Sequence, residues 1–422
     1  MNEELLHYLW SYKLMNKKLE TTNGSEVIIH SPGQRNYDAG PDFFNAIIEI
    51  DSIKWAGNIE IHVDASDWFK HKHDNDNTYD NILAHVVYNN DISVTRKNGD
   101  IIPSIELKSQ IQKQIFNQYS KLVLSISDIS CGNELKNIIP ITRIQWFEKL
   151  AFDRLQNKTQ NFQDLLYASN GNFLEVAMQK IARSFGYSVN ADAMEQLAKS
   201  IGHRIILKHS TNRFQLEALF FGASGLLNNI QNEKYPIMIK AEYEYLKSKY
   251  SIQESSNKIW KFMRMRPANF PTIRISQMAG VLHNISGDIT QLFDVDNINK
   301  LRILLSSNAS KYWNTHYKFG NEVRSQVKTL GPTTIDVIIL NTIIPLIFFY
   351  GKISGKQSYI DKVIKWISEI KAEDNKITRR FKSFGIKTTN ATDSQGLIEL
   401  YSSYCLEKQC LKCMFGKKLI YG

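Results

Sequence analysis

Features of exported, membrane-spanning and repetitive proteins are scarce in this sequence of 422 residues. Its first residues, MNEELLHYLW, are acidic and lack the basic segment and apolar stretch of a signal peptide. The most apolar segment, residues 335–351, is short for a membrane span and contains Asn341, Thr342 and Pro345, which favours a buried helix. No fixed-period repeat or low-complexity tract is present. We therefore expect a cytoplasmic protein without a membrane partner.

The composition is that of a folded protein, with 43% hydrophobic and 22% charged residues, and the length predicts two or three domains. The net charge of +10 is unevenly distributed: residues 1–110 carry 10 Lys and Arg against 17 Asp and Glu, whereas the remainder carries 42 against 25. Six of the ten histidines also lie within residues 1–110. This division suits a metal site beside a surface for a polyanion. The alternative is that the basic part binds no acidic partner, because many globular domains are basic without having one.

The pattern of expected elements changes along the chain. Residues 2–19 place apolar side chains near helical spacing, and four short β-rich runs follow: SEVIIHS, FNAIIEI, GNIEIHV and NILAHVVYN. From about residue 140 to the end the pattern is helical. We predict an α+β protein, with a small mixed sheet and flanking helices in residues 1–125 and a mostly α-helical domain in residues 126–422.

Two acids and a histidine occupy the central strand runs. Glu60 and His62 are two residues apart on a strand, so both side chains point to one face. Asp42 precedes the neighbouring run, and a hairpin between residues 43–50 and 57–63 brings it close to Glu60. Two close carboxylates repel each other unless a cation holds them. A divalent ion, Mg²⁺ or Mn²⁺, is the simplest such cation.

This pattern resembles the core of the PD-(D/E)XK nucleases, in which Asp at the head of one strand is followed by Glu-x-Lys on the next, after a helix bearing Glu. Residues 41–42 and 60–62 supply the two strand motifs here, and Glu3 or Glu4 supplies the helix acid. The resemblance implies a restriction-endonuclease-like fold and a metal-dependent mechanism. Its catalytic set is Asp42, Glu60, His62 and Glu4. His62 stands where that family has lysine, and a neutral imidazole carries no fixed positive charge, which puts activity in question.

Further histidines allow a different metal site. His85 alternates with apolar residues on the fourth run, so it shares the site or is a buried core histidine. His71 and His73 lie in an expected loop, where surface residues without a role are common. The predicted metal ligands are Asp42, Glu60 and His85. A second interpretation joins His62, His85 and a carboxylate around a transition metal, since imidazole favours Zn, Fe or Mn over Mg.

Longer segments indicate a second resemblance. SPGQRNYDAGPDFFNA, GNIEIHVDASDWFKHKH and WKFMRMRPANFPTIRISQMA, together with the Cys-rich tail, are similar to a bacterial family described as domain of unknown function 2851. The similarity covers nearly the whole chain. It implies family membership and no particular activity.

Three of the four cysteines form a cluster close to the C-terminus. Cys405, Cys410 and Cys413 have the spacing Cys-x4-Cys-x2-Cys, and Cys131 lies about 275 residues upstream. Disulfides are rare in the cytoplasm, so three thiolates with a fourth donor indicate a zinc site or an iron–sulfur cluster. One early cysteine and a late trio resemble the [4Fe–4S] staple of some nucleases of DNA recombination and CRISPR adaptation, with different spacing. Zinc, [4Fe–4S] and buried thiols without metal remain alternatives.

One basic segment of the helical part favours nucleic acid as a partner. In WKFMRMRPANFPTIR, basic residues are interleaved with aromatic ones, a combination that contacts phosphates and stacks on bases. The predicted nucleic-acid-binding residues are Lys261, Arg264, Arg266 and Arg274. Alternatively, the aromatics belong to the core and the arginines pair with acids. A second basic run, residues 376–387, is more typical of a solvated face.

Together these features predict a metal-dependent, nuclease-like enzyme that cleaves phosphodiester bonds, with DNA as the favoured substrate. One alternative is a non-catalytic nucleic-acid-binding or assembly protein with a degenerate nuclease core. Another is a hydrolase that uses a His/carboxylate metal site on a small substrate.

Overall fold

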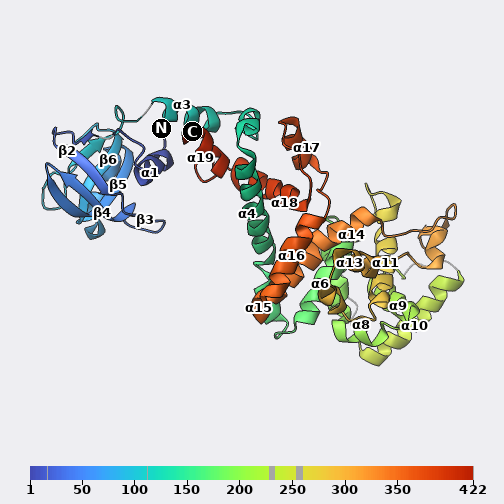
Figure 1. The fold of residues 1–422 in the computed structure, drawn as a ribbon. Helices are drawn as coiled ribbons and strands as arrows, with labels where there is room; N and C mark the ends of the chain where they lie inside the picture. The colour runs from blue at the N-terminus through green and yellow to red at the C-terminus, as the bar shows by residue number, and fades with distance from the viewer. Residues whose placement is uncertain (17, 112, 228–232, 253–259, 422) are drawn as a thin grey trace. The chain divides into compact units, whose positions relative to one another are not determined.

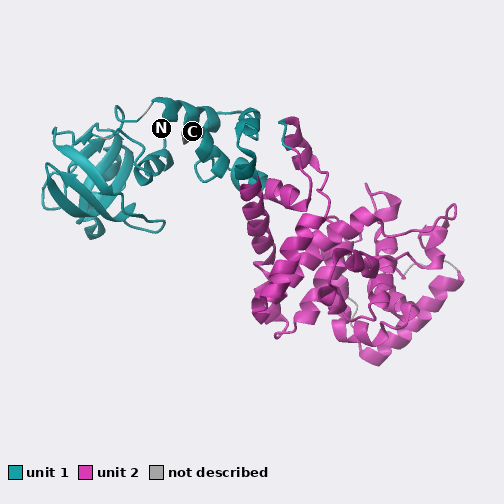
Figure 2. Ribbon diagram, in the orientation of Figure 1, with its two compact units in different colours: residues 1–143, 384–386, 400–422 teal, residues 144–383, 387–399 magenta. Residues whose placement is uncertain are grey.

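The chain forms two compact units, which we describe from a computed structural model covering residues 1–16, 18–111, 113–227, 233–252 and 260–421. Unit 1 comprises residues 1–143, 384–386 and 400–422, and unit 2 comprises residues 144–383 and 387–399 (Figure 2). Unit 1 is therefore discontinuous in sequence, with unit 2 inserted between its parts. The sequence-based boundary after residue 125 falls inside unit 1, and the C-terminal tail belongs to unit 1 and not to the helical part.

A mixed sheet forms the N-terminal part of unit 1, as the sequence predicts (Figure 1). Its strands are β1 (Leu19–Glu20), β2 (Glu26–Ser31), β3 (Gln34–Arg35), β4 (Phe43–Ile50), β5 (Ile53–Asp64), β6 (Ile82–Asn89) and β7 (Ser104–Glu106). They lie in the order β1–β2–β4–β5–β6–β7, and β3 pairs with β4. Neighbours are antiparallel from β1 to β5, whereas β5–β6 and β6–β7 are parallel. The N–H of Thr22 donates to the carbonyl of Ser104 at 2.8 Å, so the two edges of the sheet approach each other.

Helix α1 (Glu3–Ser11) packs against β5. Asn2 caps it, because its side-chain oxygen accepts a hydrogen bond from the N–H of Leu5. Leu5, Leu9 and Trp10 are fully buried in one core with the sheet. Each such side chain stabilises the fold by about 1.5–3 kcal/mol, which fixes the helix on the sheet.

The two faces of β5 have different partners. Ile59 and Ile61 belong to the same core as α1, so Glu60 and His62 project from the opposite face. Between β5 and β6 the chain forms α2 (Asp67–Lys70) and the 3₁₀ turns η1 (His73–Asn75) and η2 (Asn77–Tyr79). Trp68 of α2 and Tyr79 belong to a second small core with residues of β6. This segment therefore lies on the side of the sheet that carries Glu60 and His62.

The remaining elements of unit 1 join its first part to the tail. They are α3 (Lys113–Val123), η3 (Gly132–Asn137), the π-helical turn η7 (Tyr401–Cys405) and α19 (Met414–Tyr421). Helix α19 lies beside α3 (Figure 1). Leu411 and Ile420 of the tail are buried in the same core as α1 and the sheet. The tail is therefore an integral part of unit 1.

Unit 2 is helical. Its helices, of which α4 begins and α18 ends in unit 1, are α4 (Pro140–Thr159), α5 (Phe162–Ala168), α6 (Phe173–Phe185), α7 (Ala191–Ile201), α8 (His203–His209), α9 (Arg213–Ala223), α10 (Lys234–Tyr250), α11 (Pro271–Asn284), α12 (Gln291–Asp294), α13 (Ile298–Leu305), α14 (Pro332–Ile338), α15 (Ile344–Ser354), α16 (Gln357–Glu369), α17 (Lys376–Ser383) and α18 (Ala391–Leu400). Short elements are η4 (Pro267–Asn269), η5 (Lys311–Asn314), the π-helical turn η6 (Ile339–Ile343) and the hairpin of β8 (His316–Lys318) and β9 (Asn321–Glu322).

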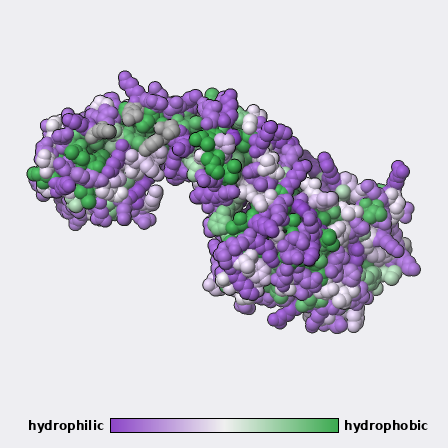
Figure 3. All heavy atoms as spheres, in the orientation of Figure 1, coloured by the Kyte–Doolittle hydropathy of each residue, from purple (hydrophilic) through white to green (hydrophobic). Residues whose placement is uncertain are grey.

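The most apolar helix runs through α14, η6 and α15. Within the described residues, Pro332–Ser354 is the one helix whose length and hydropathy of 1.8 would allow it to cross a membrane. Of its apolar window, 72% is buried inside the structure. On the face of unit 2 seen in Figure 3, hydrophilic side chains cover most of the surface and apolar ones form small groups. The helix therefore contributes to the core of unit 2, as the polar residues within it suggest.

Candidate metal centre

The structure brings Asp42 and Glu60 together across β4 and β5. Asp42 immediately precedes β4, and a register shift between Phe43 and residue 46 marks a bulge at this end of the strand. The backbone N–H of Asp42 donates to Oε2 of Glu60 at 3.1 Å. In turn, the N–H of Ile61 donates to Oδ2 of Asp42 at 2.9 Å. Each carboxylate is thus positioned by the backbone of the other strand.

Three imidazoles form a cluster beside Glu60. Nε2 of His62 lies 3.1 Å from Nδ1 of His71, and the ligand atoms of His62, His71 and His73 all lie within 4.8 Å of one another. Oε1 of Glu60 is 3.3 Å from Nε2 of His73 and 3.6 Å from Nε2 of His62. Four donors that share one ion at about 2.1 Å are spaced roughly 3.0–3.5 Å apart in octahedral or tetrahedral geometry. Three of the separations, at 3.1, 3.3 and 3.6 Å, are close to that spacing.

Aromatic packing fixes the segment that carries His71 and His73. The ring of His73 stacks on Tyr79 with 3.9 Å between centroids, and the buried ring of Trp68 meets its edge at 5.4 Å. Lys72, between the two histidines, has φ of 63°, a conformation that side chains other than glycine adopt rarely. Such backbone strain is concentrated at functional sites. These contacts hold His73 beside Glu60, and the ring of His71 lies next to that of His73.

His85 lies behind His62, on the neighbouring parallel strand β6. Its Nε2 is 2.8 Å from Nδ1 of His62. Its own Nδ1 is buried and has no hydrogen-bond partner among the described residues. When His62 donates from Nδ1 to His85, the lone pair on Nε2 of His62 is free to bind a metal. His85 is thus placed to orient His62, and it lies outside the cluster of His62, His71 and His73.

Burial determines the protonation of these groups. It lowers the pKa of His62 to about 3, helped by the nearby charges of His85, His73 and His71. It also lowers the pKa of His85 to about 3. Both imidazoles are consequently neutral near pH 7, as metal ligands must be. Burial raises the pKa of Glu60, against the hydrogen bond from His73, so its ionised form benefits from a cation.

Helix α1 and strand β3 supply the side chains beside Asp42. Nε2 of His7 lies 3.0 Å from Oδ2 of Asp42, with the separation of an ion pair but without hydrogen-bond alignment. The guanidinium of Arg35 lies 3.1 Å from Nδ1 of His7. Glu3 is the α1 acid on this side, because burial and the charge of Asp42 raise its pKa. Glu4, proposed from the sequence, instead lies 3.7 Å from Lys412.

Sequence reasoning therefore selected part of this group. Asp42, Glu60, His62 and His85 are brought together, whereas Glu4 is not. From the sequence, His71 and His73 were expected in a loop, where surface residues without a role are common. His7 was missed, although it follows Glu3 and Glu4 at helical spacing and so had a recognisable signal.

The basic residues predicted to bind nucleic acid lie in unit 2 and differ in exposure. Lys261, Arg264 and Arg266 are exposed in the segment before η4. Arg274 is 5% exposed within α11. Its guanidinium donates to Tyr187 Oη at 2.7 Å and to the side chains of Asn269 and Gln277 at 2.7 and 2.9 Å. Arg274 is therefore a structural residue and is not placed to contact a phosphate.

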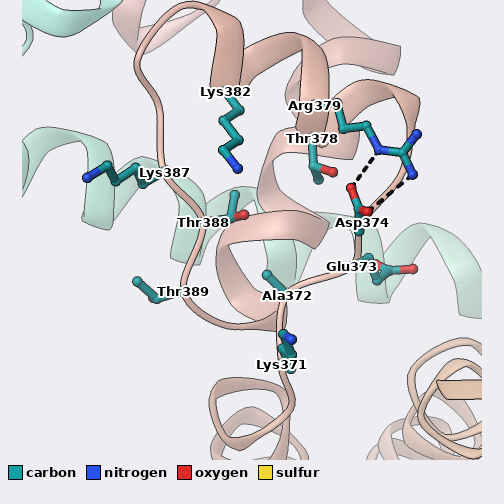
Figure 4. A pocket seen from close by; sticks show the side chains of 10 residues that line it. All are labelled: Lys371, Ala372, Glu373, Asp374, Thr378, Arg379, Lys382, Lys387, Thr388 and Thr389. Atoms are coloured by element: carbon teal, nitrogen blue, oxygen red, sulfur yellow. Dashed lines mark hydrogen bonds and ion pairs between the residues drawn. The ribbon is translucent and has the colours of Figure 1, made fainter. Parts of the chain in front are cut away.

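The second basic run lines a pocket of unit 2 with a volume of about 580 Å³ (Figure 4). Arg379 forms two hydrogen bonds with Asp374, at 2.7 and 3.2 Å. Lys382 points into the space, whereas Lys387 points away from it. Because acids neutralise part of this basic lining, we assign no site to the pocket.

The four cysteines, all within the described residues, form no disulfide and lie in unit 1. Burial raises the pKa of Cys131 to about 12, and the charges of Cys413 and Cys410 add to the shift. Burial also raises the pKa of Cys405, helped by Cys131, Cys413 and Cys410. The four thiols are thus close enough to act on one another electrostatically.

Comparison with known proteins gives a family and no activity. The model of a family described as "Protein of unknown function (DUF2851)" matches residues 3–376. The match includes the whole of the His and carboxylate site but ends before the cysteine trio. No curated protein and no solved structure matches the chain.

Proposed function

The chain belongs to the DUF2851 family, whose description names no activity, and we propose from the site itself that it is a metal-dependent hydrolase of phosphodiester bonds, with DNA as its substrate. The observation that carries the proposal is the cluster of His62, His71 and His73, whose ligand atoms lie within 4.8 Å of one another, with Glu60 and Asp42 beside it. Buried ionisable groups with strongly shifted pKa values, gathered in one place, are typical of functional sites.

The donor set favours a transition metal. Three imidazoles and one carboxylate suit Mn²⁺, Zn²⁺ or Fe²⁺ better than Mg²⁺, which prefers oxygen ligands. Of the two ions expected from the sequence, Mn²⁺ therefore fits better. Four protein ligands leave two positions of an octahedral ion for a phosphate oxygen and a water molecule. His71 is exposed and Glu60 buried, so solvent and substrate approach from the His71 side.

Residues around the donor set have separate roles. When bound, the ion would polarise a phosphoryl oxygen and lower the pKa of a bound water. Asp42 lies next to Glu60 and is the carboxylate that accepts a proton from the attacking water. His7 positions Asp42, and Arg35 behind it supplies the fixed positive charge that His62 lacks relative to the lysine of the PD-(D/E)XK pattern.

The order of elements supports a nuclease over other hydrolases. A helix with Glu3 precedes β2 and the β4–β5 hairpin, with Asp42 at its head and Glu60 within it, an order similar to that of the PD-(D/E)XK pattern. Next to Arg35, the ring of Tyr37 is 80% exposed and lies 5.1 Å from the guanidinium. An exposed aromatic ring and an arginine at the rim of a metal site suit stacking on a base and contact with a phosphate.

A cleavage assay on the full-length protein tests the proposal. Labelled single- and double-stranded DNA, RNA and a chromogenic phosphodiester are incubated with Mn²⁺, Zn²⁺ or Mg²⁺. We expect DNA cleavage with Mn²⁺ that is lost in Glu60→Gln and in Asp42→Asn. His30→Gln is the control, because His30 pairs with Glu49 away from the donor set. Metal-dependent cleavage of the small ester alone would favour the small-substrate hydrolase, and binding without turnover would favour a degenerate core.

A further inference from the structure

The four cysteines gather where the two parts of unit 1 meet. Cys131 directly precedes η3, Cys405 ends η7, and Cys410 and Cys413 lie between η7 and α19. Cys131 and Cys410 both pack against the core formed by α1, the sheet and the tail. From this arrangement we propose that Cys131, Cys405, Cys410 and Cys413 hold one [4Fe–4S] cluster, independently of the hydrolase site.

Hydrogen bonds hold the two cysteine-bearing segments against each other without help from a metal. The ammonium of Lys408, three residues after Cys405, donates to the carbonyls of Ser125 and Ser127 and to Oγ of Ser130. Tyr401 Oη donates to Asp128 at 3.3 Å. Lys408 itself has φ of 52°, the left-handed conformation, so the turn between Cys405 and Cys410 is tightly constrained. The segment before Cys131 is therefore preorganised to meet the trio.

The placement of the four thiols favours a bound metal centre over buried thiols without metal. They are the only cysteines of the chain, and two segments that lie far apart in sequence bring all four into unit 1. A metal deprotonates each thiol that binds it, and the proton passes to solvent. Lys408 and the other lysines of the tail then offset the charge of the thiolates.

The spacing of the sulfurs favours a cluster over a single zinc. With Zn–S bonds of about 2.3 Å, thiolates around one zinc stand roughly 3.8 Å apart. Among the described residues, the one group of three ligand atoms within 4.8 Å is that of His62, His71 and His73, so no three cysteine sulfurs are that close. In a [4Fe–4S] cluster each thiolate binds a different iron, and the sulfurs stand further apart. A set in which no three sulfurs lie within 4.8 Å of one another fits the cluster and does not fit one zinc.

A cluster here would act as a staple. Unit 2 is inserted between Cys131 and the trio, so the chain leaves unit 1 after Cys131 and returns to it before Cys405. A centre bound by all four cysteines would link these two segments of unit 1 covalently. Structural metal centres contribute directly to folding free energy, and closing a long loop removes entropy from the unfolded chain. The role is therefore to hold the tail against the sheet domain, and it needs no electron transfer.

Metal analysis of the full-length protein, expressed and purified without oxygen, tests the inference. We expect about four iron and four sulfide per chain, a brown colour, and an EPR signal after dithionite reduction. One zinc per chain without iron would overturn the cluster, and so would the absence of both metals. These readouts use the unmodified protein and do not depend on DNA cleavage.

Variants test which residues hold the centre. Cys410→Ser and Cys131→Ser should each lose most of the iron, lower the melting temperature and expose the tail to limited proteolysis. Leu406→Ser is the matched control, because Leu406 follows Cys405 and is 53% exposed. It should keep iron and melting temperature. Full iron and sulfide in Cys131→Ser would contradict the four-cysteine site.

Discussion

Ionisable residues are used differently in the two units. In unit 1, residues that are far apart in sequence converge and are buried: Glu60 is 5% exposed and His62 is 2% exposed. In unit 2, basic residues either stay at the surface, as Arg266 does, or become structural, as Arg274 does. Net charge per domain therefore did not locate a site. The candidate site is indicated instead by buried ionisable side chains that lie close together.

The largest effect should come from removing the carboxylate of the donor set. Glu60→Gln preserves shape but takes away the anionic ligand, so Mn²⁺ affinity should fall by more than about a hundredfold, the upper range for residues that only support a ligand. Isothermal titration calorimetry measures this. Glu49→Gln, on the neighbouring strand β4 and paired with His30, should bind as the unmodified protein does. Equal Mn²⁺ affinity in Glu60→Gln and Glu49→Gln would show that Glu60 does not bind the ion.

Removing the residue behind a ligand should have a smaller effect. His85→Phe keeps an aromatic ring but leaves Nδ1 of His62 without its partner at 2.8 Å. We expect metal affinity to fall about 10- to 100-fold. His85→Gln, which can still accept a hydrogen bond, should recover part of the loss. A His85→Phe variant with undiminished affinity would show that His85 is only a core residue.

Substitutions in unit 2 sharpen the contrast between exposed and buried arginines. Arg274→Ala removes the hydrogen-bond donor to Tyr187 Oη and to Oε1 of the buried Gln277, and should destabilise unit 2 by about 2–3 kcal/mol in urea unfolding. The triple change of Lys261, Arg264 and Arg266 to Ala should leave stability unchanged. If these three residues bind DNA, the same change should lower the salt dependence of binding by about two to three counterions. A stable Arg274→Ala variant together with a destabilised triple variant would contradict the structural role of Arg274.

The smallest effect is a pH dependence confined to unit 1. Burial lowers the pKa of His62 and His85 to about 3, below about 6.5 in an unfolded chain. Below about pH 6.5 the unfolded state then binds more protons than the folded state. The stability contributed by the two neutral imidazoles is therefore complete above about pH 6.5 and is lost as pH falls below it. Burial raises the pKa of Glu60, which acts in the opposite direction but through one group. Metal-free protein should thus melt several degrees lower at about pH 5 than at about pH 7.

His85→Phe supplies the comparison for this pH dependence. It removes one of the two buried imidazoles, so the fall in melting temperature should be shallower than in the unmodified protein. The same fall in both proteins would mean that other groups cause it.

The strand part of the site was predictable because strand geometry is regular. A spacing of two puts Glu60 and His62 on one face, and a hairpin brings Asp42 to Glu60. His71 and His73 were not predictable, because their positions depend on stacking against Tyr79 and Trp68 and on the unusual backbone of Lys72. Loop conformations of this kind leave no periodic signal.

Helix register and long-range contacts explain the remaining differences. Whether Glu3 or Glu4 faces Asp42 depends on a rotation of about 100° per residue, which the sequence pattern did not resolve. The burial of Arg274 follows from α11 being enclosed on nearly all sides, although its segment looks like an exposed basic run. The inclusion of the tail in unit 1 depends on contacts such as that of Lys408 with Ser125, far apart in sequence.

The most direct test of the account is a crystal structure of the protein soaked in Mn²⁺, with anomalous scattering measured at the manganese edge. We predict one strong peak, at about 2.0–2.3 Å from Oε1 of Glu60, Nε2 of His62, Nδ1 of His71 and Nε2 of His73. A peak held by Asp42 and Glu60 without the imidazoles, or no peak near Glu60 at all, would contradict it.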